Sequence, residues 1–195
     1  GNRLWRKNAA DNDGDGKLTA EDGVDLNRNF PDHWGYTPAG SSTIPADQIF
    51  RGPAAGSEPE TQAVVGLARR VPFRFVLNYH SFGQLLLYPM GWQEQTPTAD
   101  QPIYTALAGT TLTPAIPGYR PKLSTDLYPT NGETASWAHA ETGALARVPV
   151  YTTREILHVQ RRIARVVTEG AGAGLAATYR LVHASRTVTH SPAYW

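Results

Sequence analysis

The 195-residue chain has no cysteine and a single methionine. The lack of cysteine excludes a disulfide framework, a thiolate nucleophile and any zinc or iron–sulfur site with cysteine ligands. No apolar run approaches the roughly 20 residues that span a bilayer, so we expect no membrane segment. Neither sign of charge is in excess, because 18 lysine and arginine residues face 17 aspartate and glutamate residues. We therefore expect no nucleic-acid partner, and any metal chemistry must use histidine and carboxylates.

Hydrophobic patterning predicts helices and strands in one α/β domain. Runs of β-branched and aromatic residues predict three strands, at 73–79, 85–88 and 144–151. Helical spacing predicts four helices, at 57–70, 103–112, 133–140 and 155–182. Ser57 and Glu60 have the spacing of a capping box at the start of the first helix. Pro149 lacks a backbone N–H, which predicts that the third strand lies at an edge or a bend.

Two short polar segments concentrate arginine and asparagine. Arg28 offers a planar fork that suits a carboxylate or phosphate, and Asn27 adds a directional donor beside it. Arg6 lies in the other segment. One interpretation is a pocket for a small anion. The other is that each arginine pairs with a local carboxylate, such as Asp25 or Asp32.

His80 follows an apolar run, at the end of a predicted strand. The carboxyl ends of strands in α/β sheets are where such folds place their ligands. His80 is therefore a candidate metal ligand or general base, and a hydrogen-bonded structural histidine is the alternative. The other five histidines have no partner at a convincing metal-ligand spacing, and the sequence contains no His-x-x-Glu.

A second candidate metal site lies between residues 11 and 22. Asp11, Asp13 and Asp15 alternate, Gly16 permits a sharp turn, and Asp22 stands at the twelfth position of a calcium-loop pattern. The twelfth residue is aspartate rather than the longer glutamate, and no clear helix precedes the loop. Calcium binding and a solvated loop of Asx turns are both open interpretations.

Several segments together resemble zinc carboxypeptidases of the carboxypeptidase A (M14) type in order and spacing. They are Arg3-Leu-Trp-Arg6-Lys7, Gly23-Val-Asp-Leu-Asn-Arg-Asn-Phe30, Arg51-Gly-Pro-Ala-Ala-Gly-Ser-Glu-Pro-Glu60 and Asn78-Tyr-His-Ser81, followed by Tyr128 nine residues before Trp137. The resemblance implies a mixed, mostly parallel sheet flanked by helices. It identifies residues 1–195 as a single, partial catalytic domain, with the clearest match over 1–145 and a divergent helical part at 155–195.

The resemblance also implies roles for individual residues. His80 resembles the third ligand of a single zinc ion, and Arg6 resembles the arginine that stabilises the oxyanion. Asn27 and Arg28 match the pair that grips the free C-terminal carboxylate of a peptide. Tyr128 resembles the mobile tyrosine that closes over the bound residue. These roles imply hydrolytic release of the C-terminal residue from peptides and proteins.

Two features depart from the family pattern. The His-x-x-Glu pair that supplies the other zinc ligands lies upstream of Arg6 in the family and is missing here, which favours N-terminal truncation over degeneracy. The chain alone is then expected to bind zinc weakly and to be inactive. The general base of the family is matched by Glu155 after a short shift, with a salt-bridged glutamate at a helix start as the alternative.

The resemblance leaves alternatives for the whole protein. A catalytically inactive peptide- or calcium-binding homologue is one, and an amidase of the same fold is another, although the Asn27–Arg28 pair argues against an amidase. Small Ala135 and nearby Glu133 match the pocket that reads the C-terminal side chain, which predicts broad specificity for apolar and basic residues. We expect a secreted bacterial monomer from the resemblance alone.

Overall fold

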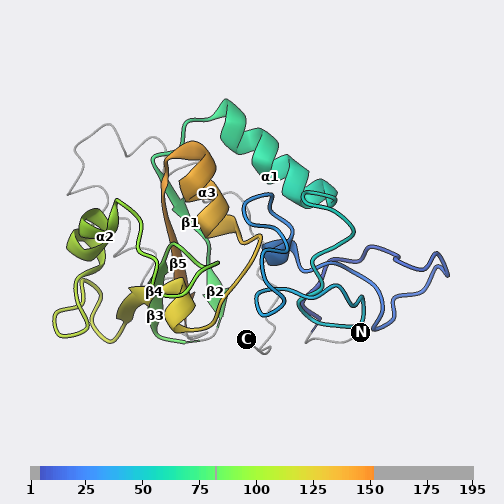
Figure 1. Cartoon of the computed structure of the whole chain (residues 1–195), viewed down its shortest axis with the longest axis horizontal. Coiled ribbons are helices and arrows are strands. Elements are labelled where there is room, and N and C mark those ends of the chain that lie inside the picture. The colour runs from blue at the N-terminus through green and yellow to red at the C-terminus, as the bar shows by residue number, and fades with distance from the viewer. Residues whose placement is uncertain (1–4, 82, 152–195) are drawn as a thin grey trace.

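The computed structural model describes residues 5–81 and 83–151 (Figure 1). In chain order the elements are η1 (Leu26–Arg28), α1 (Pro59–Arg70), β1 (Phe75–Leu77), β2 (His80–Ser81), β3 (Leu85–Tyr88), α2 (Gln101–Ala108), β4 (Arg120–Leu123), η2 (Ser124–Asp126), α3 (Thr134–Thr142) and β5 (Leu145–Tyr151). The predicted helix at 155–182 and the candidate base Glu155 lie outside the described residues.

The strands form a mixed sheet in the order β1-β5-β3-β4, and β2 also pairs with β5. β5 runs parallel to β1 and β2 and antiparallel to β3, whereas β3 and β4 are parallel. The pairing is therefore mostly parallel, and helices flank the sheet (Figure 1). This arrangement confirms the predicted fold class.

Pro149 was predicted to place its strand at an edge or a bend, and the edge position is wrong, because β5 lies between β1 and β3. The register explains why the proline is tolerated there. β1 pairs with residues 145–147 of β5, and β2 pairs with Val150 and Tyr151. Pro149 thus lies opposite the gap between β1 and β2, so its missing N–H removes no ladder bond on that side. The predicted strand at 73–79 is shortened to β1, because Asn78 and Tyr79 leave the ladder, and β2 follows directly after them.

β3 is buried on both faces of the sheet. Leu85 and Leu87 of β3 point into a cluster with Trp137 and Val65, on the side of α1 and α3. Leu86 and Tyr88, which alternate with them, point into a second cluster on the side of α2. This period of two explains why the four residues of β3 read as one apolar run, as expected for a strand covered on both faces.

Two predicted helix boundaries need correction. Ser57 does not cap α1, since the helix begins after Glu58 without a side-chain cap. The Ser57 hydroxyl is occupied elsewhere: it accepts from Asn29 Nδ2 at 2.9 Å and donates to Glu58 Oε1 at 2.7 Å. α2 ends at Ala108 rather than at 112, because Gly109 follows with a φ of 78°.

Residues 5–57 form an N-terminal loop region whose only described helix is the single turn η1. Polar side chains that bond to the backbone hold this region together. Asn29 is fully buried: its Nδ2 reaches Arg51 O and Ala54 O, and its Oδ1 accepts from Glu58 N. Figure 1 shows the region beside the sheet region, residues 58–151, rather than stacked on it.

None of the helices among the described residues is long and apolar enough to cross a bilayer.

Candidate functional site

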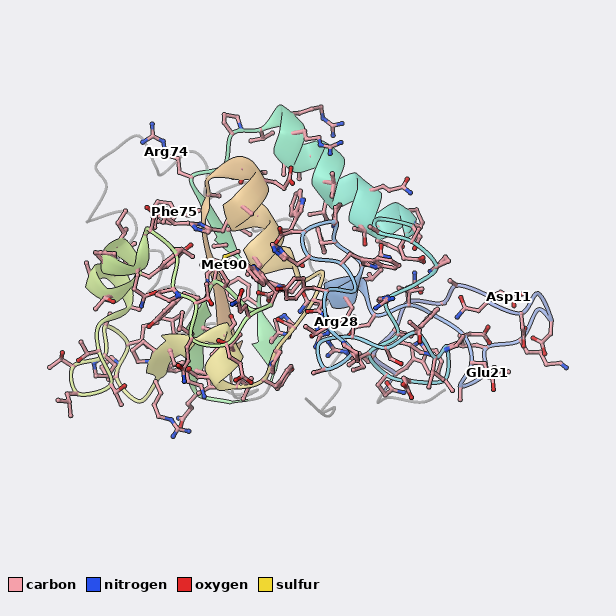
Figure 2. The ribbon with its side chains drawn as sticks, viewed as in Figure 1. Asp11, Glu21, Arg28, Arg74, Phe75 and Met90 are labelled. Carbon is pink, nitrogen blue, oxygen red and sulfur yellow. The ribbon has the colours of Figure 1, made fainter. Side chains whose placement is uncertain are left out.

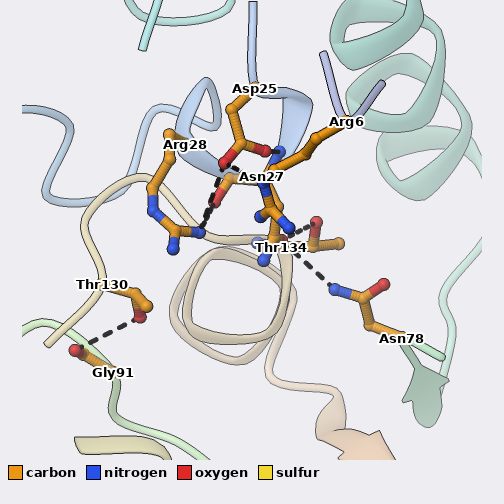
Figure 3. A network of polar contacts seen from close by, with 8 residues as sticks. All are labelled: Arg6, Asp25, Asn27, Arg28, Asn78, Gly91, Thr130 and Thr134. Carbon is orange, nitrogen blue, oxygen red and sulfur yellow. Dashed lines mark hydrogen bonds and ion pairs between the residues drawn. The ribbon is translucent and has the colours of Figure 1, made fainter. Parts of the chain in front are cut away.

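The site begins with η1, a turn that Asp25 starts and organises. Asp25 Oδ1 accepts a hydrogen bond from Asn27 N at 3.1 Å and so caps the turn. Its Oδ2 accepts from Arg6 Nε at 2.8 Å and lies 3.9 Å from Arg28 Nη1. One buried carboxylate thereby fixes the positions of both arginines (Figure 3).

The amide of Asn27 is oriented by three donors on its carbonyl oxygen (Figure 3). Thr134 donates to Oδ1 through N at 3.1 Å and through Oγ1 at 3.0 Å, and Asn78 donates through Nδ2 at 3.2 Å. Because three donors contact the same side-chain atom of Asn27, that atom is the carbonyl oxygen of the amide and the other is the nitrogen. No acceptor among the described residues contacts Asn27 Nδ2, so its N–H groups remain for a ligand.

Arg28 is a buried guanidinium, with 3% of its side chain exposed. Its Nη1 donates to the carbonyl of Asn27 at 2.8 Å, and its buried Nε has no hydrogen-bond partner. The ion pair with Asp25 is long. Arg28 therefore keeps donor capacity, and Figure 3 shows its guanidinium on the side of η1 that faces Thr130 and Gly91.

Arg6 pairs with Asp25 and is influenced electrostatically by Tyr128. Burial alone lowers the pKa of Arg6, but the charge and hydrogen bond of Asp25, and Tyr128 after them, raise it above its ordinary value. The influence of Tyr128 on Arg6 shows that the two side chains lie within electrostatic reach. Arg6 pairs with Asp25 through Nε alone, so the local ion pair considered from the sequence exists without using the whole guanidinium.

His80 starts β2 and lies near the two arginines. Its pKa is lowered to about 4, first by burial and then by the positive charges of Arg6 and Arg28, while Asp25 opposes them. The imidazole is thus neutral at physiological pH, which is the form that binds a metal ion. His80 therefore lies within electrostatic reach of Arg6 and Arg28, and its role as a metal ligand stays a prediction.

The acidic loop lies apart from this cluster. Asp11, Asp13 and Asp15 each present an oxygen within 4.8 Å of the others, and Figure 2 shows Asp11 at the end of the molecule away from Arg28. Asp22 is not one of this group. Its buried carboxylate instead accepts from Asn12 N and Thr19 N.

The acidic loop also contains the Asx turns that were the alternative to calcium. Asp11 accepts from Gly14 N and Gly16 N, and Asp13 accepts from Asp15 N. Both interpretations of the loop therefore stay predictions.

Sequence reasoning missed two residues of the site, Asn78 and Thr134. Asn78 was part of a quoted motif without a role of its own, and Thr134 stood at a predicted helix start. Thr134 could have been noticed in the sequence, because threonine is a residue type that often makes side-chain hydrogen bonds at the start of a helix. For Asn78 no signal existed, because its partner lies 51 residues away in the sequence.

Comparisons with known proteins show the family of the chain. The sequence model of the family described as zinc carboxypeptidase matches residues 1–170. The chain belongs to this family. Carboxypeptidase A5 of Macaca fascicularis is 32% identical over 143 residues, which cover 71% of this chain and 31% of that protein. Bovine carboxypeptidase B is 33% identical over 150 residues, covering 71% and 33%. The chain thus spans about a third of these zinc carboxypeptidases.

Two solved structures share the fold of this chain. Carboxypeptidase A from Helicoverpa armigera matches with a TM-score of 0.66 at 21% identity, over 92% of this chain and 47% of that one. Thrombin-activatable fibrinolysis inhibitor matches with a TM-score of 0.62 at 24% identity, over 75% and 37%.

The family implies zinc, and the described residues fit that ion in part. The neutral, partly buried imidazole of His80 suits a zinc ligand. No set of three candidate ligands includes His80 among residues 5–81 and 83–151, where the acidic loop forms the one such group. His80 is therefore the one candidate zinc ligand that the sequence predicted among the described residues, and we derive no step through the metal.

Proposed function

We propose that this chain is the part of a metallocarboxypeptidase that captures the free C-terminal carboxylate of a peptide whose last residue is hydrolysed. The observation that carries the proposal is the orientation of Asn27. Its Oδ1 accepts three hydrogen bonds, so Nδ2 is left as a donor beside the guanidinium of Arg28. A neutral donor next to a planar cationic donor suits a carboxylate better than an uncharged group.

The remaining residues suit the chemistry at the adjacent bond. Arg6 lies on the other side of Asp25 and carries a fixed positive charge, which would stabilise an oxygen that becomes negative during hydrolysis. Tyr128, within electrostatic reach of Arg6, would cover the bound residue. Zinc held partly by His80 would supply an activated water molecule. Glu155 as the general base, secretion from a bacterium and a monomeric state stay predictions from the family resemblance.

The test compares ligands with a free and an amidated C-terminus. We expect the full-length, zinc-loaded protein to bind and hydrolyse a free-acid peptide and to leave the amidated peptide intact. Arg28→Met should weaken binding of the free acid about 100-fold, because hydrogen bonds to a charged group contribute roughly 1.5–3 kcal/mol each. Arg74→Met is the matched control, since Figure 2 shows exposed Arg74 at the far end of the sheet.

The same experiment separates the alternatives. Equal binding of the amidated peptide would overturn the carboxylate assignment and favour an amidase. Tight binding of the free acid without turnover in the zinc-loaded protein would favour a peptide-binding homologue without catalysis.

A further inference from the structure

Asn131 is a fully buried side chain that the proposed hydrolysis does not use. It lies in the segment 130–132, shortly before α3. Its backbone N donates to Gly40 O at 3.1 Å, and its Nδ2 donates to Thr37 O at 2.5 Å and lies 3.3 Å from Thr37 Oγ1. Asn131 thus ties the segment before α3 to the turn at 37–40 in the N-terminal loop region.

The amide of Asn131 has one defined orientation. Its Nδ2 faces a carbonyl oxygen, which only a donor can contact this closely, so the other atom is Oδ1. Oδ1 is buried and has no hydrogen-bond partner among the described residues. A Cβ on residue 40 would lie 2.5 Å from Oδ1, so glycine lets the turn approach the amide this closely. An unpaired oxygen in a buried amide costs stability, so Asn131 contributes a defined position for two chain segments rather than packing alone.

The turn at 37–40 is connected to the start of η1. Ser42, two residues after the turn, forms a β-bridge with Phe50. The carbonyl oxygen of Phe50 accepts from Asp25 N at 2.8 Å. Since Asp25 caps η1 and pairs with Arg6, the turn and the start of η1 belong to one connected unit.

The residue after Asn131 holds the end of η1. Gly132 O accepts from Phe30 N at 2.9 Å. A Cβ on residue 132 would lie 2.5 Å from the carbonyl oxygen of Arg28, so the two backbones are in contact. The side chain of Arg28 in turn donates to Asn27 O at 2.8 Å. The place of the guanidinium therefore depends on where Gly132 lies.

The sheet region anchors the other side of Asn131. Thr130 donates to Gly91 O through its backbone N at 2.6 Å and through Oγ1 at 3.3 Å (Figure 3). Gly91 lies shortly after the end of β3. Because Thr130 is fixed to this part of the chain, Asn131 and Gly132 hold the loop region from a base that the sheet supplies.

These contacts close a ring around the two clamp residues, Asn27 and Arg28. The members of the ring are Asp25, Phe50, Ser42, Gly40, Asn131, Gly132 and Phe30. We propose, on the basis of the proposed function, that Asn131 is a positioning residue, which holds this ring closed and so keeps the donors of Arg28 where they meet the substrate's carboxylate. Among the described residues its hydrogen bonds go to Thr37 and Gly40 alone, so Asn131 acts through the backbone of residues 28–30 and not on the ligand. A charged hydrogen bond needs such support, because it weakens when the direction of the donor is lost.

The test measures the ratio of the affinities for N-acetyl-leucine and N-acetyl-leucinamide, which differ in the C-terminal carboxylate. Calorimetric titration of the full-length, zinc-loaded wild type should show the acid bound at least about 10-fold more tightly than the amide. Asn131→Ala removes both side-chain contacts with Thr37 and should lower this ratio at least about threefold. For free-acid peptides it should raise KM and leave kcat within about twofold, because the clamp holds the substrate and the transition state alike.

Gly40→Ala presses on the same amide from the turn, because its Cβ would lie 2.5 Å from Oδ1 of Asn131. It should also lower the ratio at least about threefold, and it decides the test if Asn131→Ala does not fold. The double variant should lose no more than Asn131→Ala alone, since alanine at position 131 leaves room for the new Cβ. A larger loss would show that the two substitutions act on different contacts, which overturns the proposal.

Tyr104→Phe is the matched control for lost stability. Tyr104 is 0% exposed in α2, and its hydroxyl accepts from Ala146 N at 3.1 Å. The control should unfold more easily and leave the ratio within about twofold, because it lies away from the ring. A fall of less than about threefold in Asn131→Ala, or an equal fall in Tyr104→Phe, overturns the positioning role. A wild-type ratio near one overturns the carboxylate capture itself, so the two failures are distinguished.

Discussion

The N-terminal loop region and the sheet region are held together by different forces. In the sheet region, β3 is buried on both faces and two apolar clusters cover it. In the loop region, buried asparagine and aspartate side chains bond to the backbone in place of regular ladders, as Asn29 and Asp22 do. Apolar packing tolerates small changes of shape, whereas a network of this kind fails when one donor is lost.

The candidate site lies where the two regions meet. Arg6, Asn27 and Arg28 come from the loop region, and His80 and Thr134 come from the sheet region. A carboxylate clamp needs fixed donor directions, which hydrogen-bonded loops supply. A metal ligand needs a rigid anchor, which a strand supplies.

The largest effect is expected in the sheet region. Leu86→Ala should lower the free energy of unfolding by about 2–5 kcal/mol, because Leu86 is 2% exposed and its removal leaves a cavity. Leu112→Ala is the control, since Leu112 is 93% exposed, and should change stability by less than about 0.5 kcal/mol. Denaturant titration measures both. Similar losses for the two variants would contradict an apolar origin of the stability of this region.

A smaller loss is expected in the loop region. Asn29→Ala should cost about 2 kcal/mol, because it leaves the buried carbonyls of Arg51 and Ala54 and the N–H of Glu58 without a partner. Asn12→Ala removes an exposed asparagine and serves as the control. The comparison between the regions breaks down if both asparagine variants unfold at the same denaturant concentration.

The contact between the regions can be tested at Gly132. Its φ is 63°, and a Cβ would lie 2.5 Å from the carbonyl oxygen of Arg28. Gly143 has a similar φ of 67° with no atom within 4 Å of its Cβ. Gly143→Ala should cost about 1 kcal/mol for the backbone alone, and Gly132→Ala should cost about 1–2 kcal/mol more and weaken binding of free-acid peptides. Equal losses would show that the close approach to Arg28 is unimportant.

The orientation of the clamp can be tested at Asn78. Asn78→Ala removes one donor to Asn27 Oδ1 and should weaken binding of free-acid peptides about 3- to 10-fold. Asn78→Asp should weaken it more, because a carboxylate repels Oδ1 and attracts the Nδ2 of Asn27. Ala and Asp variants with equal affinities would argue against an orienting role. Amidated peptides serve as the reference for non-specific loss.

The smallest effect is a pH dependence in the loop region. Hydrogen bonds from Thr19 N and Asn12 N lower the pKa of Asp22 below its ordinary value of 3.8. A carboxylate with a lowered pKa stabilises the fold above its ordinary pKa and loses that contribution as the pH falls through its folded value. Asp22→Asn should therefore lower the melting temperature at pH 7, and the difference from wild type should shrink below about pH 4. A difference that is constant from pH 7 to pH 2 would contradict this assignment.

Local patterns in the sequence were sufficient for several features. The apolar run at 85–88 predicted β3 with the observed bounds. A strand that is buried on both faces can be recognised from its side-chain types alone, because every residue in it is apolar. The order of the polar motifs predicted that Arg6, Arg28 and His80 belong to one site, and the electrostatic influence of both arginines on His80 is in keeping with that prediction. The edge position of Pro149 was predicted wrongly. The sequence shows that a proline cannot donate a backbone hydrogen bond, but it does not show whether a neighbouring strand has an acceptor at that position.

Amino-acid order alone determined the class of the fold, the family and the residue types available for chemistry, because these depend on short-range periodicity and spacing. Tertiary structure alone decided that Asn78 and Thr134 orient the amide of Asn27 and that Asp22 lies outside the acidic group. Each of these contacts joins residues that fold and packing bring together, and the direction of a hydrogen bond or the sign of a pKa shift depends on which buried groups meet.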